Sequence, residues 1–375
     1  MTYASKWRTV TPRRTRGSDA GNSYVLKEED GAEHMKAVLY DAPKTWSVTQ
    51  IPTPEAAPGQ VRIKVDQVGV CGTDLHIHEG EFGAVFPLVP GHEVVGVVDQ
   101  LGEGVTRFRL GEQVTVNPNV YCAQCAYCLA GRLGQCEAML GFGSNFAGFF
   151  AEYAVADHKL VFSAEGLPSD TAVFSEPASC AMHGLESLQM RPGGSALVLG
   201  AGPTGLLLAQ LIASGGASSV TVAGPSQFKL DTAGRLGVDR TVRISRDDPD
   251  GNVAALLAAS PHGDGYDAVV EATGSPTVGD ICVPLTRRGG TVLIYGVTRE
   301  DDVVRFRPFD VFRREITIRG SFAEMTSFAA AIDALRGGRV RTDGIVTHRF
   351  SLDEYGDALE TLRNDPTAHK VVIVP

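Results

Sequence analysis

The sequence predicts an α/β fold in which a mainly β domain is joined to a doubly wound parallel sheet. Two observations support this prediction. Between Met35 and about Gly166, short β-type runs such as VRIKVDQVGV alternate with glycine and proline, and no internal repeat appears. Later in the chain, four strand-like runs (SALVLGAG, SSVTVAG, YDAVVEATG and TVLIYGV) are separated by helical or loop-like segments, an alternation typical of a parallel sheet covered by helices.

The chain length also indicates two domains. A chain of 375 residues with 43% apolar content exceeds what one hydrophobic core usually supports. We place the mainly β domain at residues 35–187, which end in a helix-like segment, and the parallel sheet at 188–320. The tail, 321–375, ends in the strand-like KVVIVP and is expected to rejoin the first domain. Residues 1–34 lack the apolar core of a signal peptide, and we expect a disordered extension there.

Charge and cysteine content limit the function classes. The balance of 34 basic and 44 acidic residues gives a net charge of −10, which argues against nucleic acid or an anionic membrane as the main partner. The longest apolar run, SALVLGAGPTGLLLAQLIASGG, is interrupted by glycines and a proline, so it predicts a strand, a turn and a helix rather than a membrane span. Four of the seven cysteines cluster locally, which suggests a metal site in a reducing, cytoplasmic compartment.

The clustered cysteines follow the spacing C-x2-C-x2-C-x7-C, at Cys122, Cys125, Cys128 and Cys136. Four thiolates spaced in this way can converge on one tetrahedral ion, and zinc is expected because it is redox-inert and accepts sulfur ligands. A site closed by four protein ligands has no open position for a substrate, so its predicted role is to fold a loop that lacks a core. Two disulfides or an iron–sulfur cluster are the alternatives.

A glycine pattern predicts a dinucleotide site. The stretch LVLGAGPTG places Gly200, Gly202 and Gly205 directly after an apolar strand and before an apolar helix, with Pro203 and Thr204 in the turn. The glycines allow a tight turn, a close approach of the backbone to a pyrophosphate and close packing of helix on strand. Such a match is common by chance, but its strand-to-helix context supports cofactor binding.

A second metal site is predicted from residues far apart in the sequence. Cys71 lies in GVCGTDLHIHEG, His92 and Glu93 lie in VPGHEVVGVV, and Glu176 lies in SEPASCAMHG. Each fragment alone is weak evidence, because a single cysteine or histidine is usually a core or surface residue. In this order, and before a dinucleotide fold, the four side chains suggest the open zinc site of an alcohol-oxidising enzyme.

These segments together resemble the zinc-dependent medium-chain dehydrogenases over about residues 35–375. EPASCAMHG together with GAGPTGLLLAQ is most similar to the sorbitol, xylitol and arabinitol (polyol) dehydrogenase branch. The resemblance implies a GroES-like catalytic domain with a zinc lobe and a Rossmann dinucleotide-binding domain. It also implies that Cys71 and His92 bind a catalytic zinc, with Glu93 and Glu176 as direct or water-bridged ligands.

The same resemblance assigns a proton relay. Thr73 and His76 stand at the spacing of the family's hydroxyl-to-imidazole relay, and a neutral histidine near pH 7 suits the task of carrying the alcohol proton away. Glu176 is expected to serve both catalysis and metal binding. The alternatives are a turn hydrogen bond for Thr73 and an exposed loop position for His76, and His78 is left unassigned.

The strand SSVTVAG ends without the acidic residue that would hold the adenosine ribose hydroxyls of NAD. About 20 residues beyond the glycine pattern the chain has Gly224, whose lack of charge suits a 2′-phosphate. Ser226 and Lys229 could donate to that phosphate, and relatives that use NADP have a basic residue near the position of Lys229. The sequence therefore predicts NADP, with NAD as the alternative.

The predicted reaction is hydride transfer between a nicotinamide cofactor and a sugar alcohol, such as arabinitol, xylitol or sorbitol, or the matching ketose. Threonine dehydrogenases and sugar-phosphate dehydrogenases of the galactitol phosphate type are alternatives. A zinc-lobe module that binds protein or nucleic acid is the non-enzyme alternative. The family's dimers often extend the sheet through the last strand of the nucleotide domain, here expected to be TVLIYGV, so we expect a homodimer or homotetramer.

Overall fold

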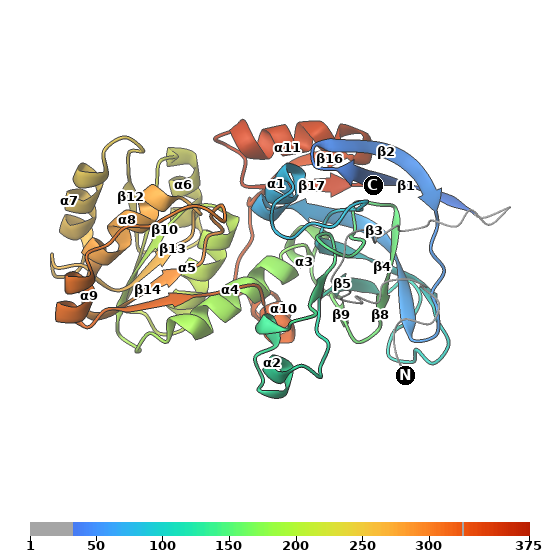
Figure 1. Ribbon diagram of the computed structural model, residues 1–375, viewed down its shortest axis with the longest axis horizontal. Helices are drawn as coiled ribbons and strands as arrows, with labels where there is room; N and C mark the ends of the chain where they lie inside the picture. The colour runs from blue at the N-terminus through green and yellow to red at the C-terminus, as the bar shows by residue number, and fades with distance from the viewer. Residues whose placement is uncertain (1–32, 325) are drawn as a thin grey trace, which may run out of the picture.

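The computed structural model describes residues 33–324 and 326–375. Figure 1 shows two lobes side by side, with helix α4 (Ser175–Leu188) between them. The predicted extension lies outside the described residues except for Glu33 and His34, and His34 already belongs to strand β1. None of the helices in the described ranges combines the length and apolarity needed to cross a lipid bilayer.

The first lobe is built on a seven-stranded, largely antiparallel sheet in the order β16-β17-β3-β4-β5-β9, with β8 paired to β3. Along the first half of β3, Val61, Ile63 and Val65 are buried whereas Arg62 and Lys64 are not, because alternate side chains of a strand face opposite sides of the sheet. The strands of this sheet are β3 (Gln60–Val70), β4 (Glu93–Leu101), β5 (Gln113–Val116), β8 (Tyr153–Asp157), β9 (Val161–Ser163), β16 (Val346–Ser351) and β17 (Lys370–Val374).

Smaller elements cover this sheet. Two antiparallel pairs lie beside it, and short helices connect the strands. These elements are β1 (His34–Ala42) with β2 (Thr45–Pro52), β6 (Asn119–Val120) with β7 (Leu140–Gly141), and the helices α1 (Gly72–Glu79), α2 (Ala126–Leu129), η1 (Leu133–Gln135), α3 (Ser169–Ala172), η2 (Leu352–Glu354) and α11 (Tyr355–Asn364). Strands β16 and β17 come from the end of the chain, so the tail rejoins the first lobe as the sequence suggested.

The second lobe is a six-stranded parallel sheet in the order β12-β11-β10-β13-β14-β15. All five residues of the central β10 are buried, which explains why this strand is a continuous apolar run in the sequence. Its strands are β10 (Ser195–Leu199), β11 (Ser219–Gly224), β12 (Arg240–Arg243), β13 (Tyr266–Glu271), β14 (Thr286–Ile294) and β15 (Thr317–Gly320). Its helices are α5 (Pro203–Ser214), α6 (Gln227–Arg235), α7 (Pro249–Ala259), α8 (Pro276–Leu285) and α9 (Pro308–Arg314).

The predicted α/β class is confirmed, but the predicted edge of the parallel sheet is wrong. The first four residues of TVLIYGV form the end of β14, and β15 pairs beyond it as the outermost strand. The sequence TIRG of β15 is short and mostly exposed, so it lacks the apolar run by which the other strands were found.

Helix α4 connects the two lobes through a common core. It packs against α5 of the second lobe and against α10 (Phe328–Arg336), which leads the chain back to the first lobe. One hydrophobic cluster therefore contains Val95 of β4, Phe174 before α4 and Leu206 of α5. Because both lobes pack on α4, a side chain near its amino end lies where the two lobes meet.

Candidate active site

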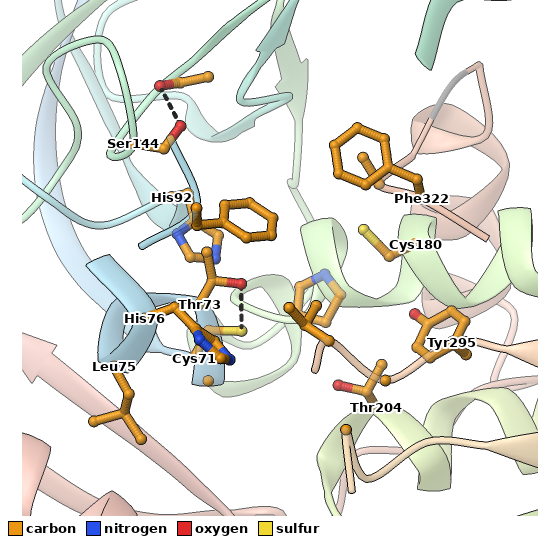
Figure 2. Close-up of a pocket in the computed structure, with 18 of the residues that line it drawn as sticks. Cys71, Thr73, Leu75, His76, His92, Ser144, Cys180, Thr204, Tyr295 and Phe322 are labelled. Carbon is orange, nitrogen blue, oxygen red and sulfur yellow. Dashed lines mark hydrogen bonds between the residues drawn. The ribbon is translucent and has the colours of Figure 1, made fainter. Parts of the chain in front are cut away.

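A cavity of about 840 Å³ lies between the lobes and is lined by residues of both. Figure 2 shows Cys71, Thr73 and His92 on one side of it and Thr204 and Tyr295 on the other. A cleft between a mainly β lobe and the end of a parallel sheet, where the chain order reverses at β10, is a common place for a substrate and a dinucleotide to meet.

Three predicted metal ligands come together at one end of this cavity. The ligand atoms of Cys71, His92 and Glu93 lie within 4.8 Å of one another. Cys71 follows β3 and Glu93 begins β4, and these antiparallel strands pair with Gly69 opposite Glu93, so two distant sequence segments meet. A side chain at position 69 would collide with the Glu93 carboxylate, which explains the glycine.

Glu93 is also held by a residue that the sequence analysis missed. The Lys370 ammonium lies 2.6 and 2.8 Å from the two Glu93 carboxylate oxygens, and both side chains are buried. Glu176, the fourth predicted ligand, lines the same cavity but is not part of the close group. It accepts a hydrogen bond from the Cys180 thiol at 3.1 Å, and burial raises its pKa above the ordinary value although His92 acts in the opposite direction.

The Asp74 carboxylate lies next to both Cys71 and His92. It is fully buried, one carboxylate oxygen accepts a hydrogen bond from the Cys71 backbone N–H at 2.8 Å, and the other lies 3.7 Å from His92 Nδ1. A carboxylate beside Nδ1 leaves Nε2 of the histidine for a metal. The C-G-T-D segment contained this signal, since an acidic residue three positions after a helix N-cap often bonds back to the cap.

The predicted relay residues both lie on α1 and line the cavity. Thr73 Oγ1 lies 3.7 Å from the Cys71 sulfur, and His76 Nδ1 lies 2.7 Å from a carboxylate oxygen of Glu81. Glu81 in turn lies 3.8 Å from the Arg299 guanidinium of the second lobe, so this contact crosses the cleft. His78 points elsewhere and contacts the Tyr40 hydroxyl at 2.8 Å.

The four-cysteine lobe lies apart from the cavity. The sulfur atoms of Cys122, Cys125, Cys128 and Cys136 lie within 4.8 Å of one another, and none forms a disulfide. Hydrogen bonds from the Cys128 and Glu137 backbone lower the pKa of Cys125, which favours its thiolate, whereas burial raises the pKa of Cys128. This arrangement disagrees with the two-disulfide alternative and fits a tetrahedral metal ion.

The glycine-rich turn has the local geometry that the sequence suggested. Gly200 has a φ of 127°, a left-handed conformation, and a Cβ there would lie 2.8 Å from the Ala272 carbonyl oxygen. Gly205 packs so closely on the Gly200 carbonyl that no side chain fits. Gly202 is the N-cap of α5, followed by Pro203, so free backbone N–H groups at this helix end can bind phosphate.

The predicted adenosine end of the cofactor site has no acidic residue at the end of its strand. Gly224 ends β11, and Lys229 lies one turn into α6. Among the described residues, no hydrogen bond or ion pair is found for the Lys229 ammonium. Burial lowers its pKa, the charge of Arg246 lowers it further, and the charge of Asp365 acts in the opposite direction. Ser226 donates its hydroxyl hydrogen to the Pro366 carbonyl at 3.1 Å, so it is less available than expected.

Arg246 is a residue that the sequence analysis missed. It follows β12, whose Arg243 pairs with Gly224, and it lies close enough to Lys229 for their charges to interact. The signal was the basic segment RISR at the end of the neighbouring strand, because adjacent parallel strands end at the same edge of a sheet.

Family models match both lobes. The description "Alcohol dehydrogenase GroES-like domain" fits residues 57–166, and "Zinc-binding dehydrogenase" fits residues 203–336. D-arabinitol dehydrogenase 1 of Uromyces fabae is 40% identical over 329 residues, which are 88% of this chain and 94% of that protein. D-altritol 5-dehydrogenase of Agrobacterium fabrum is 32% identical over 349 residues, which are 90% of this chain and 98% of that protein.

A solved structure supports the same likeness. A zinc-binding dehydrogenase of Sinorhizobium meliloti 1021, bound to NADP, has a TM-score of 0.84 to this chain at 31% sequence identity. The match covers 92% of this chain and 100% of the other, so it includes both lobes and the cavity between them.

Proposed function

The chain belongs to the family of zinc-binding alcohol dehydrogenases and is an enzyme, and on that premise we propose that it transfers a hydride between a sugar alcohol, or the matching ketose, and NADP. The observation that carries this proposal is the shared cavity, where Cys71, His92 and Glu93 lie close together. Thr204, at the start of α5, lies across the cavity from Cys71 and His92 (Figure 2). The likeness to D-arabinitol and D-altritol dehydrogenases supports a polyol as the alcohol.

The donor set fits zinc, because a thiolate, an imidazole and carboxylates are the ligands of open zinc sites. Cys71 and His92 would hold the ion. Glu93 lies closest to Cys71 and His92, but both of its oxygens are hydrogen-bonded to Lys370. Glu176 lies farther away and has only the weak Cys180 thiol as a donor among the described residues, so either glutamate can complete the site. A zinc ion there supplies Lewis-acid chemistry that makes an alcohol hydroxyl more acidic.

The side chains on α1 provide a path for the alcohol proton. Thr73 lies next to Cys71 and can pass a proton between the substrate hydroxyl and His76. Glu81 accepts the Nδ1 hydrogen of His76, so Nε2 is left as the proton acceptor. The partly exposed His76 then releases the proton to solvent.

The charges around the cavity favour a neutral substrate over a sugar phosphate. Five carboxyl groups and two guanidinium groups line it. Arg299 lies 3.8 Å from Glu81, and Arg363 lies 3.3 Å from Glu79, so each positive charge is partly offset by a neighbouring carboxylate. A sugar phosphate would therefore be repelled, and the polyol remains the better fit.

A substrate panel tests the proposal. The values of kcat/KM should be measured with NADP and NAD for arabinitol, xylitol, sorbitol, galactitol phosphate, threonine and a simple secondary alcohol. We expect the highest value for one of the free polyols with NADP. A clear preference for threonine or for the phosphorylated polyol would replace the proposed substrate class with that alternative.

The cofactor preference can be changed at Gly224. A Cβ at this position would lie 3.4 Å from the Ala201 Cβ, an ordinary contact, so Gly224→Asp fits and places a carboxylate near the adenosine ribose. That carboxylate favours free ribose hydroxyls and repels a 2′-phosphate. A charge-assisted contact of about 1.5 to 3 kcal/mol moves the NADP to NAD ratio of kcat/KM by roughly ten- to a hundredfold toward NAD.

Lys229→Ala tests the same site from the other side, because it should weaken NADP and leave NAD nearly unchanged. Lys159→Ala, an exposed lysine of the first lobe, is the matched control. If the unmodified enzyme prefers NAD and Lys229→Ala leaves the ratio untouched, the NADP assignment is wrong and Gly224 is only a turn residue.

We expect two zinc ions per chain, with different lability. Metal analysis during chelation should show the open site at Cys71 emptying first, while the four-cysteine site keeps its ion. Cys125→Ser should reduce zinc content by one ion and lower folding stability, because a zinc lobe without its metal has little core of its own. One zinc ion in fully active protein would show that one of the two sites has been misassigned.

The edge of the parallel sheet supports a homodimer or homotetramer. Ile318 of the outermost strand β15 is 38% exposed, and Phe309 and Phe312 of the adjoining α9 are 68% and 78% exposed. Pairing of β15 with its copy would cover unpaired strand groups and these apolar side chains. Light scattering should give a multiple of the 39.8 kDa chain mass, and Ile318→Asp should yield monomers.

The state of the cysteines supports a reducing compartment such as the cytoplasm. None of them is in a disulfide among the described residues.

A further inference from the structure

The segment between β15 and α10 buries a carboxylate that the proposed chemistry does not use. Glu324 is fully buried, and its Oε2 has no hydrogen-bond partner among the described residues. Its Oε1 lies 3.4 Å from both Asn119 Nδ2 and Tyr121 Oη, and the Tyr121 hydroxyl also donates to the Glu324 backbone carbonyl at 2.9 Å. A buried carboxyl group with two donors on one oxygen and none on the other requires an explanation.

The donors all come from one face of one extended segment. Asn117, Asn119 and Tyr121 alternate along the chain that contains β6 and leads into the four-cysteine lobe, and side chains two residues apart on a strand face the same way. The Asn119 and Tyr121 side chains hydrogen-bond to Glu324, and Asn117 is near enough to lower the pKa of that carboxyl group. The Glu324 carboxyl group therefore fixes the orientation of the side chains on this face of the segment.

This network decides which way the Asn119 amide points. Its NH₂ group donates to Glu324, and its backbone N–H donates to the Asn117 side-chain oxygen at 2.9 Å. Asn119 also lines the cavity, and no described residue donates to its carbonyl oxygen. Because a carboxyl oxygen on the buried side accepts the NH₂ group, the carbonyl oxygen remains for a donor in the cavity.

We propose that Glu324 is a positioning residue for substrate binding, which holds Asn119 with its carbonyl oxygen toward the cavity to accept a hydrogen bond from a polyol hydroxyl away from the reacting carbon. This inference rests on the proposed polyol dehydrogenase function. It adds a source of selectivity for polyhydroxylated substrates over simple alcohols.

The acceptor on Glu324, rather than its charge, carries this role. Burial raises the pKa of Glu324 to about 7, against the lowering effect of the neighbouring Asn119 and Asn117 side chains. Since the donors reach Oε1, a proton on the carboxyl group belongs on the unpartnered Oε2. Oε1 then accepts in both protonation states, and a glutamine, which keeps an oxygen at that place, should substitute for the acid.

Two variants of one position test the inference through KM for a preferred polyol and for a monohydric secondary alcohol such as 2-butanol. Glu324→Met keeps the length but removes the acceptor, and it should raise KM for the polyol about three- to tenfold while leaving kcat and KM for 2-butanol nearly unchanged. Glu324→Gln should stay close to the unmodified enzyme. Glu103→Gln, which removes an exposed charge far from the cavity, is the control.

Asn119→Ala provides a second route in case Glu324→Met fails to fold. It should cause the same selective rise in KM for the polyol, and the double variant should be no worse than Asn119→Ala, because both changes remove one contact. The inference is overturned if KM rises equally for both substrates, if neither changes, or if Glu324→Gln is as impaired as Glu324→Met. If the unmodified enzyme oxidises no polyol, the proposed function fails and this assignment fails with it.

Discussion

His92→Ala is expected to lower kcat/KM at least about a thousandfold in a protein that still folds. The imidazole would hold the ion that acidifies the alcohol, and loss of several kcal/mol of such stabilisation corresponds to this factor. His92 is largely buried at the end of the cavity, beside Asp74 rather than in the hydrophobic core. The measurement is steady-state kcat/KM, together with zinc content, which should fall from two ions per chain to one.

The control for this prediction is His262→Ala, because His262 is an exposed histidine in a turn of the second lobe. It should retain full activity. Circular dichroism and thermal unfolding of both variants separate a catalytic effect from misfolding. If folded His92→Ala retained more than a tenth of the activity, His92 would not be a ligand of the catalytic ion.

The fold could be predicted where the sequence contained a period or a spacing. Strand β10 is buried on both faces, so its apolar run was visible, and the glycine pattern followed directly from the turn that Gly200 must make. Strand β15 escaped prediction because its four residues are mostly exposed and lack such a run. The outermost strand of the sheet could therefore be identified only from its backbone pairing with β14 in the structure.

The site could be predicted only where short motifs named its residues. Cys71 and His92 lie in recognisable segments, whereas their supporting partners depend on contacts between distant parts of the chain. Lys370 is 277 positions from Glu93, and Glu324 is 205 positions from Asn119. Neither lysine nor glutamate is unusual in sequence, and only the fold shows that these charged side chains are buried.

Lys370→Met is expected to lower the free energy of unfolding by about 3 to 5 kcal/mol, because it leaves the buried Glu93 carboxylate without its partner. Burial lowers the pKa of Lys370, but Glu93, together with the charges of Cys71 and Glu176, raises it more, so the net pKa lies above the ordinary value of 10.5. The contribution of the Lys370 charge to stability is therefore present at pH 7 and up to about pH 10.5, and it is lost as the pH rises through the folded-state pKa. Urea unfolding at pH 7 measures the loss.

The double variant Lys370→Met with Glu93→Gln shows whether the unpaired charge causes this loss. It should recover a substantial part of the stability, since an amide costs less to bury than a carboxylate. Lys64→Met, an exposed lysine on β3, is the matched control and should change the free energy of unfolding by less than about 0.5 kcal/mol. If Lys370→Met changed the free energy of unfolding as little as Lys64→Met does, the Glu93 charge would have another partner. The zinc ion is the first candidate for that partner, and repeating the unfolding with the metal removed would test it.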